Sequence, residues 1–552
     1  MFENPDYIVI GSGSAGSTIA YRLGENPSNQ VLVLEFGGSD FSPFIQMPAA
    51  LSYPMNMPKF DWGYKAEPEP ELNGRSLVCP RGKVIGGSSS INGMIYVRGN
   101  PGDYHEWARM GATGWDYPDV LPYFQRMEKS HGGTSEFRGS DGPLHVTHGK
   151  RDNPLHEAFV SAAQQVGYER TEDYNAYRQE GFGPADMTVY NGSRFSTAKA
   201  YLKPALAKKN VKLVTRVLVD KIIFEGKKAV GVEFFYQGQK KIIKVKKDVI
   251  LSAGSINSPA ILQRSGIGDA DHLKSLGIEV QSHLPGVGEN LQDHLEVYFQ
   301  VKCLQPITLY KYLNPFSKLL IGMQWMFLKS GPGATNQFET LGFIRSDKNI
   351  SYPDIQFHFL PVAIRYDGKA PSEGHGFQLH VGPMRSGSRG HVKINSSDPQ
   401  KAPTIKFNYM SHEDDFPTFR KALLLRREIL SQSAMDPFNG GEIQPGNEVV
   451  SDEGLDEFIR NNCESAYHPC GTCKMGQRDD PTTVVENDCK VKGFSNFFLA
   501  DSSIFPRICN GNLNSPSIMT GEKASDHILG KAPLTPSNLK PFVHPDWQNN
   551  QR

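Results

Sequence analysis

The chain begins with a glycine-rich turn between an apolar run and a helical pattern, and this feature most limits how it can fold. The run Tyr7–Ile10 predicts a buried strand that ends in Gly11-x-Gly13-x-x-Gly16, and a helical pattern continues over Ser17–Leu23. The first glycine permits a tight turn, the second lets the backbone approach a pyrophosphate, and the third lets helix and strand pack closely. The pattern predicts the first β-α-β unit of a dinucleotide-binding fold.

An acidic residue follows the next predicted strand at the spacing that such a unit requires. The apolar run Val31–Leu34 ends in Glu35, about 20 residues after the glycines. Its carboxylate can accept hydrogen bonds from a ribose and would repel a 2′-phosphate, which disfavours NADP. Ser14 and Ala15 lie in the turn before the predicted helix, whose N-terminal free N–H groups attract phosphate. The motif leaves FAD and NAD open, and its alternative is a glycine-rich turn without a ligand.

Length and composition exclude several classes of protein. The 552 residues predict two to four lobes, and the formal net charge of zero gives no footprint for nucleic acid. No apolar run is long enough to span a membrane, and no signal-peptide pattern precedes the first strand, so we expect a cytoplasmic protein. Residues Leu319–Lys329 are strongly apolar; an internal helix is the favoured interpretation, and peripheral docking on a membrane is the alternative.

The cysteines predict neither disulfides nor a metal centre. There are seven, an odd number scattered along the chain, which suits a reducing compartment. Cys470 and Cys473 form a C-x-x-C pair, but a zinc site would need two more ligands and only His468 is near in sequence. We expect small packed cysteines and no metal.

The apolar patterning alternates between strand and helix periods and predicts an α/β fold (α+β overall). Helical patterns occur at 101–110, 117–129 and 417–431, and a strand-like run at 354–360. Four strand patterns resemble a β-meander, at 211–217, 221–224, 229–236 and 241–251. The last residues, 531–552, are polar and proline-rich and predict a loose tail.

Four further blocks rich in glycine and small polar residues follow the first one. They lie at 81–93, 254–268, 286–294 and 467–476, and a fifth segment, Gly511–Pro516, follows the predicted strand Phe497–Ala500 and Asp501. In these blocks the chain resembles the glucose-methanol-choline (GMC) family of FAD oxidoreductases over about residues 5–530. The resemblance implies FAD rather than NAD. It also implies a Rossmann-like FAD-binding domain built from discontinuous segments and a mixed sheet-and-helix substrate-binding domain.

The resemblance implies the following domain limits and cofactor contacts. The FAD-binding domain would comprise 1–150, 195–295 and 466–530, the substrate-binding domain 151–194 and 296–465, and the tail 531–552. The cofactor contacts would be Gly11, Gly13, Ser14, Ala15, Gly16, Glu35, Gly86, Gly87, Ser88, Asn92, Gly93, Val219, Ala253, Asp501 and Asn512.

The family's catalytic pair matches His468 and Asn512. Oxidising an alcohol requires a group that takes the hydroxyl proton while hydride leaves for flavin N5, and histidine titrates in a suitable range. The amide of Asn512 can orient the same oxygen. Without the resemblance, a satisfied buried histidine is an equal alternative.

Within the family, the chain resembles most the members that oxidise choline. In these members a glutamate at the position of Glu296 faces the trimethylammonium group, which binds an opposing charge and aromatic faces. Tyr467 could supply such a face, and Tyr53 and Phe357 are further candidates. The expected product is betaine aldehyde, with further oxidation to glycine betaine as an option. Glu296 as a surface acid is the alternative.

One position departs from the family's choline oxidases. They carry a histidine in the second block that bonds covalently to the flavin, and here the residue is Ile91, so FAD should be non-covalent. This favours a dehydrogenase with an electron acceptor, such as a quinone, a dye or a respiratory carrier, and leaves dioxygen open. A dehydrogenase for another primary alcohol, a lyase and a non-redox flavin-binding protein are the alternatives, and a homodimer is open.

Overall fold

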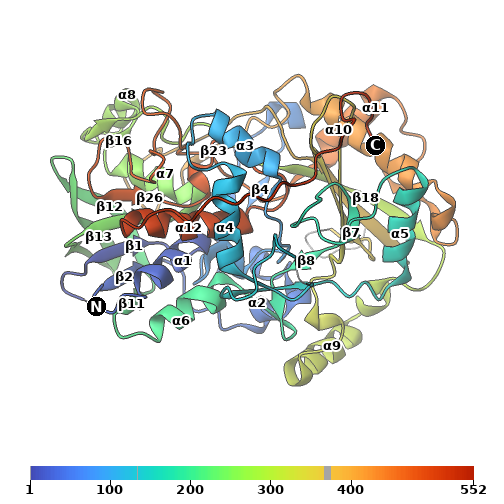
Figure 1. Ribbon diagram of the computed structural model, residues 1–552, viewed down its shortest axis with the longest axis horizontal. Coiled ribbons are helices and arrows are strands. Elements are labelled where there is room, and N and C mark those ends of the chain that lie inside the picture. Colours follow the sequence, from blue (N-terminus) through green and yellow to red (C-terminus); the bar gives the residue numbers. More distant parts are fainter. Residues whose placement is uncertain (1, 134, 366–373) are drawn as a thin grey trace.

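The computed structural model describes residues 2–133, 135–365 and 374–552. Residues 366–373, which belong to the predicted substrate-binding domain, lie outside the described residues. Figure 1 shows two halves side by side: a parallel sheet with its helices on the left, and a larger antiparallel sheet with its helices on the right. The helices are α1 Ser14–Leu23, α2 Pro43–Gln46, α3 Pro101–Arg109, α4 Tyr117–Met127, α5 Pro154–Gln165, α6 Lys203–Leu206, α7 Gly254–Arg264, α8 Ala270–Ser275, α9 Pro315–Leu328, α10 Asp415–Leu430, α11 Asp452–Asn462 and α12 Asn514–Ile528.

The first glycine motif lies at the centre of a five-stranded parallel sheet. Its order is β11 (Val211–Val214), β2 (Val31–Leu34), β1 (Tyr7–Ile10), β15 (Asp248–Leu251) and β26 (Phe497–Leu499). Every residue of β1, β2 and β26 is buried, which explains why these segments read as continuous apolar runs. Helix α1 begins at Ser14, three residues earlier than the sequence pattern predicted, and packs on α12. The predicted β-α-β unit is confirmed, and its sheet draws on distant segments.

The predicted meander is confirmed only in part. Strands β12 (Val217–Glu225), β13 (Lys228–Tyr236) and β14 (Gln239–Lys244) form an antiparallel three-stranded sheet. Two predicted runs are divided between sheets. The run 211–217 supplies β11 to the parallel sheet before β12 begins, and the run 241–251 leaves the meander after Lys244 and enters the parallel sheet as β15. Periodicity could not separate the two parts of each run, since both carry strand patterns.

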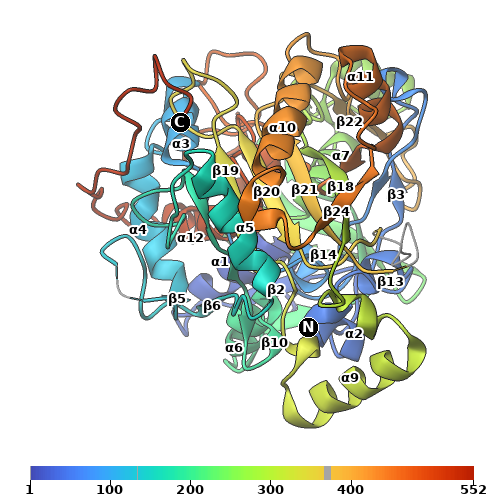
Figure 2. The same cartoon turned by 90° about the vertical axis from the view of Figure 1, so that its right-hand side faces the viewer.

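The second half of the molecule is organised around a seven-stranded sheet. Its order is β24 (Asn439–Gln444), β18 (Leu295–Cys303), β21 (Gly376–Pro383), β20 (Ile355–Leu360), β19 (Thr340–Ile344) and β7 (Gly181–Pro184), with β25 (Glu464–Ser465) paired to β18. Helices α5 and α10 lie in front of this sheet in Figure 2. The domain limits given above stay a prediction.

The other strands are short. They are β3 (Tyr64–Lys65), β4 (Val78–Cys79), β5 (Glu128–Ser130), β6 (Leu144–His148), β8 (Asp186–Met187), β9 (Val189–Tyr190), β10 (Ser193–Arg194), β16 (Ile267–Gly268), β17 (Ser282–His283), β22 (His391–Lys393) and β23 (Thr404–Lys406).

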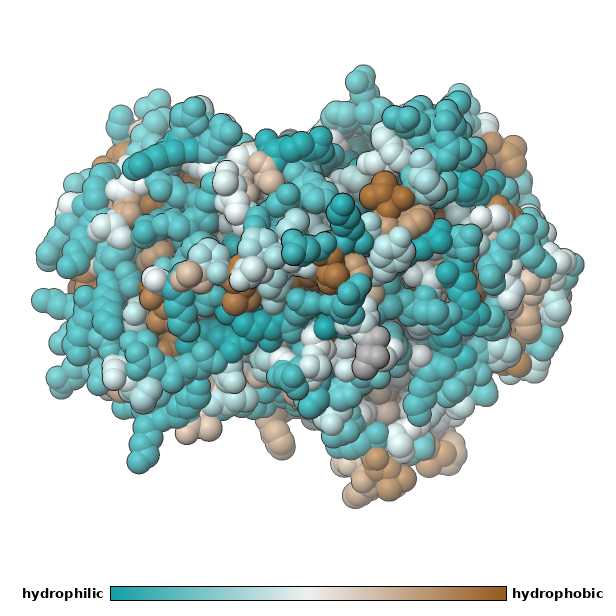
Figure 3. Space-filling view, in the orientation of Figure 1, coloured by the Kyte–Doolittle hydropathy of each residue, from teal (hydrophilic) through white to brown (hydrophobic). Residues whose placement is uncertain are grey.

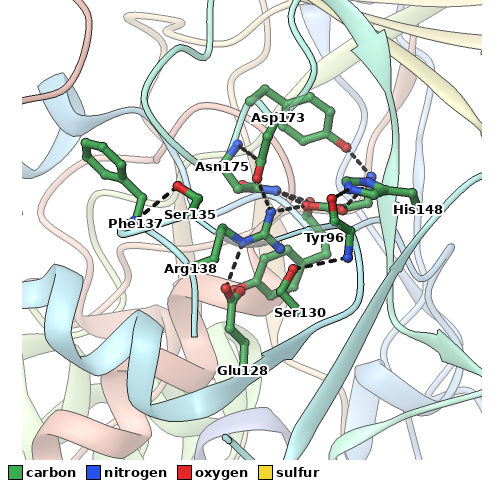
Figure 4. A network of polar contacts seen from close by, with 12 residues as sticks. Tyr96, Glu128, Ser130, Ser135, Phe137, Arg138, His148, Asp173 and Asn175 are labelled. Atoms are coloured by element: carbon green, nitrogen blue, oxygen red, sulfur yellow. Dashed lines mark hydrogen bonds and ion pairs between the residues drawn. The ribbon is translucent and has the colours of Figure 1, made fainter. Parts of the chain in front are cut away.

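A buried ionic cluster ties β5, β6 and β8 to the loop that precedes β7 (Figure 4). Arg138 pairs with Glu128 at 2.7 Å, with Asp173 at 2.7 Å and with Asp186 at 2.9 Å. His148 reaches the other oxygen of Asp186 at 2.8 Å. Burying these charges is tolerable only because each meets an opposite charge.

Two surface segments differ from their predictions. The segment 531–552 has no helix or strand, but it is held in place: Arg345 Nη1 donates to the carbonyl of Asn550 at 2.7 Å, and Arg178 lies over the ring of Phe542. The apolar run at 319–329 lies in helix α9, and this helix projects from the molecule instead of being internal. Within the described residues, no helix is long and apolar enough to cross a membrane.

Candidate active site

The glycines of the first motif have different surroundings that match their expected roles. A Cβ at Gly11 would lie 2.4 Å from the carbonyl oxygen of Ser252, and one at Gly16 would lie 2.1 Å from the carbonyl oxygen of Gly11. A Cβ at Gly13 would meet nothing within 4 Å. The first two positions are therefore closed by protein backbone, whereas Gly13 presents its backbone to open space at the N-terminus of α1.

Glu35 organises the turn beside this motif. Its Oε2 accepts hydrogen bonds from the backbone N–H of Ser12 at 2.9 Å and from the Ser12 hydroxyl at 2.8 Å, and its Oε1 accepts from the N–H of Gly37 at 2.7 Å. Burial raises the pKa of Glu35, and these hydrogen bonds oppose the rise. The carboxylate lines the cavity, so the predicted ribose contact would add to a role in fixing the turn.

The second glycine block lies directly on the first. A Cβ at Gly87 would stand 2.7 Å from Cα of Gly13, and the N–H of Gly86 donates to the carbonyl of Ser12 at 2.9 Å. Asp501 joins the later blocks, because its Oδ2 accepts from the N–H of Gly254 at 2.8 Å. Segments far apart in the sequence thus meet at one place.

A single cavity connects the first glycine motif with the predicted catalytic pair. Gly16 and Gly86 do not line it. The other predicted cofactor and substrate residues line it: Gly11, Gly13, Ser14, Ala15, Glu35, Gly87, Ser88, Asn92, Gly93, Val219, Ala253, Glu296, Tyr467, His468, Asp501 and Asn512.

A chain of hydrogen bonds fixes the tautomer of His468. The carbonyl of Met384 can only accept, so Nε2 of His294, 2.9 Å away, carries a proton and its Nδ1 is an acceptor. Nδ1 of His468 lies 3.0 Å from that acceptor and therefore carries the proton. Nε2 of His468 is left with its lone pair, and the Nδ2 amide group of Asn512 lies 3.1 Å from it. Burial, and then repulsion from His294 and His358, lowers the pKa of His468 well below its usual range.

Glu296 lies in the same cavity on β18 and is not a surface acid. It is only 4% exposed, and its Oε1 accepts from Nδ1 of His380 at 2.9 Å. Nδ1 of His358 lies 3.9 Å from the other carboxylate oxygen. Burial lowers the pKa of His358 to about 4, which keeps it neutral at pH 7.

Sequence reasoning missed four residues of this site. Phe338, His358 and His380 line the cavity, and His294 supports His468 from behind. His358 and His380 face each other across β20 and β21, and this register has no signature in the sequence. The position of His294, two residues before Glu296, was the only available signal.

Two aromatic candidates do not lie in the site. Tyr53 is 44% exposed, and Phe357 is fully buried in the core of the antiparallel sheet; neither lines the cavity. Phe338 takes the expected place of an aromatic wall, 5.4 Å from the ring of His380. Cys470 and Cys473 are buried and unbridged, and the described residues hold no group of three or more His, Cys, Asp or Glu side chains that could bind a metal.

Comparison with known proteins places the chain in a family. Models of the GMC oxidoreductase family match residues 5–296 and 386–521. The chain belongs to this family. It is 60% identical over 547 residues to the oxygen-dependent choline dehydrogenase of Brucella suis biovar 1 (strain 1330), covering 99% of this chain and 100% of the relative. It is 56% identical over the same length, with the same coverage, to the oxygen-dependent choline dehydrogenase of Sinorhizobium fredii (strain NBRC 101917 / NGR234).

Solved GMC structures share the fold over nearly the whole chain. Pyridoxine 4-oxidase from Mesorbium loti is 29% identical with a TM-score of 0.87, covering 96% of this chain and 100% of that one. A variant of formate oxidase from Aspergillus oryzae RIB40 is 25% identical with a TM-score of 0.90, covering 96% and 98%. The predicted family and fold class are therefore confirmed.

Proposed function

We propose that this GMC oxidoreductase oxidises choline to betaine aldehyde with FAD. The observation that carries the proposal is a buried carboxylate, Glu296, in the cavity that also holds His468 and Asn512. A quaternary ammonium has no N–H to donate, so it is recognised by opposite charge and aromatic faces. Glu296 supplies the charge, and Phe338 and Tyr467 supply ring surfaces on the same cavity.

The residues present fit a bound FAD. The open backbone at Gly13 and the N-terminus of α1 would hold the pyrophosphate, and Glu35 would hold the ribose of the adenosine half. Asn92 and Gly93 line the same cavity as His468 and would contact the flavin ring. Ile91 cannot form a covalent bond to the flavin, so the cofactor would be held non-covalently. When bound, FAD supplies the acceptor for the hydride.

The hydrogen-bond chain prepares His468 to act as a base. Its Nε2 lone pair would accept the hydroxyl proton of choline, while its Nδ1–H remains anchored on His294. The amide of Asn512 would donate to the developing alkoxide and hold it in place. Because burial keeps the imidazole neutral, the base is available at neutral pH.

A second oxidation and an acceptor follow from the same chemistry. Hydrated betaine aldehyde again offers a hydroxyl proton and a C–H bond at one carbon, so the same residues could convert it to glycine betaine. The reduced cofactor must then be reoxidised, and the similarity to oxygen-dependent choline dehydrogenases supports dioxygen as one acceptor.

The test is anaerobic mixing with choline, followed by the flavin absorbance. We expect choline to bleach the flavin absorbance. We also expect the enzyme to prefer choline as a substrate over 3,3-dimethylbutan-1-ol, the neutral analogue in which carbon replaces the nitrogen. Glu296→Gln should raise the KM for choline by at least about tenfold, or about 1.4 kcal/mol, and leave the neutral alcohol little affected. Bleaching by other primary alcohols only would favour another substrate, and no bleaching by any alcohol would favour a lyase or a non-redox protein.

We also propose that helix α9 docks on an anionic membrane surface. Apolar side chains gather on it at the lower edge of Figure 3, and Phe316 and Phe327 are 69% and 76% exposed. Only Trp325 is buried, and its Nε1 donates to the carbonyl of Gly192 at 2.7 Å. With 14 residues the helix is about 21 Å long, too short to span the roughly 30 Å hydrocarbon core.

Charge favours an anionic lipid surface over a basic or neutral partner. Residues 303–338 contain no aspartate or glutamate, but they carry Lys311, Lys318 and Lys329 near the ends of α9. The segment 41–60, which contains the exposed Phe41 and Phe44, likewise has no acid. Basic residues flanking an apolar helix are typical of interfacial binding to anionic lipid.

Co-sedimentation with vesicles tests this proposal. Wild type should bind vesicles containing phosphatidylglycerol, bind phosphatidylcholine vesicles less, and lose binding in high salt. Phe316→Ser with Phe327→Ser should weaken binding at least about tenfold, because each exposed ring buries apolar area in the interface. Ile242→Ser with Val450→Ser is the matched control on other exposed apolar residues. If the wild type binds no vesicles but forms dimers that the double phenylalanine variant does not form, this face is instead a contact between two copies of the chain.

A further inference from the structure

Glu296 stands at one end of a hydrogen-bonded row that leads into the antiparallel sheet. His380 and Gln378 lie on β21, and Gln300 lies beside Gln378 on β18. All four residues are 4% exposed or less. In such an environment each donor must meet an acceptor, so the row determines where every proton lies.

The orientation of the Gln378 amide is fixed from behind. The backbone N–H of Ile364 donates to its Oε1 at 2.9 Å, and Nε2 of Gln300 donates to the same atom at 2.8 Å. A backbone N–H can only donate, so the oxygen of Gln378 must face Ile364. Its NH₂ group must then face the other way, toward His380.

This orientation decides the tautomer of His380. Nε2 of Gln378 lies 2.7 Å from Nε2 of His380, and since the amide nitrogen donates, the ring nitrogen must accept. The ring proton is therefore on Nδ1, which lies 2.9 Å from Oε1 of Glu296. If the imidazole carried both protons, its Nε2–H would face the Nε2–H of Gln378, and two donors would meet with no acceptor between them.

We infer that Gln378, oriented by Ile364 and Gln300, is a positioning residue that keeps His380 a neutral donor to Glu296 and so preserves the negative charge that selects a cationic substrate. The inference rests on the proposed function. A neutral donor holds the carboxylate in one geometry, whereas an imidazolium would hold it equally well and cancel its charge. A substrate without N–H groups depends on that charge, because it cannot recover affinity by hydrogen bonding.

The experiment compares kcat/KM for choline with kcat/KM for 3,3-dimethylbutan-1-ol in the FAD-loaded enzyme. Gln378→Glu replaces the donor by an acceptor and draws a second proton onto His380, so the ratio should fall at least about threefold. His380→Gln keeps a neutral donor and should keep most of the ratio. In the double variant no imidazole remains at position 380 to take a proton, so the effect of Gln378→Glu should disappear.

Controls separate this role from a structural one. Gln444→Glu places a new acid on the neighbouring strand β24, where the amide donates to the carbonyl of Tyr298, and should leave the ratio unchanged. Gln378→Met is the substitute if Gln378→Glu does not retain FAD; it removes the donor, and its loss of ratio should also vanish with His380→Gln. An equal loss for both alcohols, or a loss that persists with His380→Gln, overturns the inference. A wild type that does not prefer choline overturns the proposed function instead.

Discussion

At the scale of single residues, the site depends on groups that can only accept or only donate. The carbonyl of Met384 fixes the protons of two imidazoles in turn, and the result is a lone pair on Nε2 of His468. The sequence indicated His468 and Asn512 through the family's motifs. It could not indicate His294 or the hydrogen bonds that orient His468. Those contacts form only because β18 pairs with β25, which places the residues before β18 beside the residues after β25.

Removing the base tests this arrangement. His468→Ala should lower kcat for choline by about 10²- to 10⁴-fold, the usual contribution of a positioned general base. FAD content should stay near that of the wild type, because the residues proposed to hold the adenosine half are Gly13, Glu35 and the N-terminus of α1, not His468. Steady-state kinetics with the flavin absorbance as a control measures both quantities. A variant with unchanged kcat would remove His468 from the proton transfer.

At the scale of elements, the cluster around Arg138 joins strands that are far apart in the chain. Burial alone would raise the pKa of Glu128, but attraction to Arg98 and Arg138 outweighs it and lowers that pKa. For Asp186 burial is likewise outweighed, chiefly by Arg138, and the pKa falls to about 2. No sequence pattern predicted this cluster, because its charges come from separate segments and their pairing appears only when the segments meet.

Arg138→Met should therefore destabilise the protein by about 3–5 kcal/mol, because it leaves buried carboxylates without their partner. The methionine keeps much of the arginine's apolar volume, so the loss reports the charge. Chemical unfolding measures it, and Arg109→Met, which removes an exposed ion pair with Glu106, should cost no more than about 1 kcal/mol. If both variants lose the same free energy of unfolding, the buried cluster contributes no more to stability than an exposed ion pair.

At the scale of the whole molecule, the sequence predicted the architecture better than the strand limits. The glycine blocks identified the parallel sheet and the cavity, since each block is local and its conformation depends on few neighbours. The run 241–251 and the exposed helix α9 were misread for the opposite reason. Which sheet receives a strand, and whether an apolar helix finds a partner, are decided by segments remote in sequence.

Acid stability follows from the histidines buried across the molecule. Burial lowers the pKa of His294 and of His358 to about 4 and that of His156 to about 3. The unfolded chain takes up protons on these residues below about pH 6.5, whereas the folded chain does not until about pH 4. As the pH is lowered through this window, the free energy of unfolding should therefore decrease, by up to about 1.4 kcal/mol per pH unit for each histidine.

The contribution of a single histidine to this pH dependence can be measured at His156, because this residue lies on α5 outside the cavity. Its Nδ1 is 3.0 Å from Oγ1 of Thr340. In His156→Gln the unfolding free energy, measured by denaturant titration at several pH values, should depend less steeply on pH by about one histidine's contribution. If the His156 variant has the same slope as the wild type, His156 already binds a proton in the folded protein. The inference that the active-site histidines are buried in their neutral form would then lose this independent support.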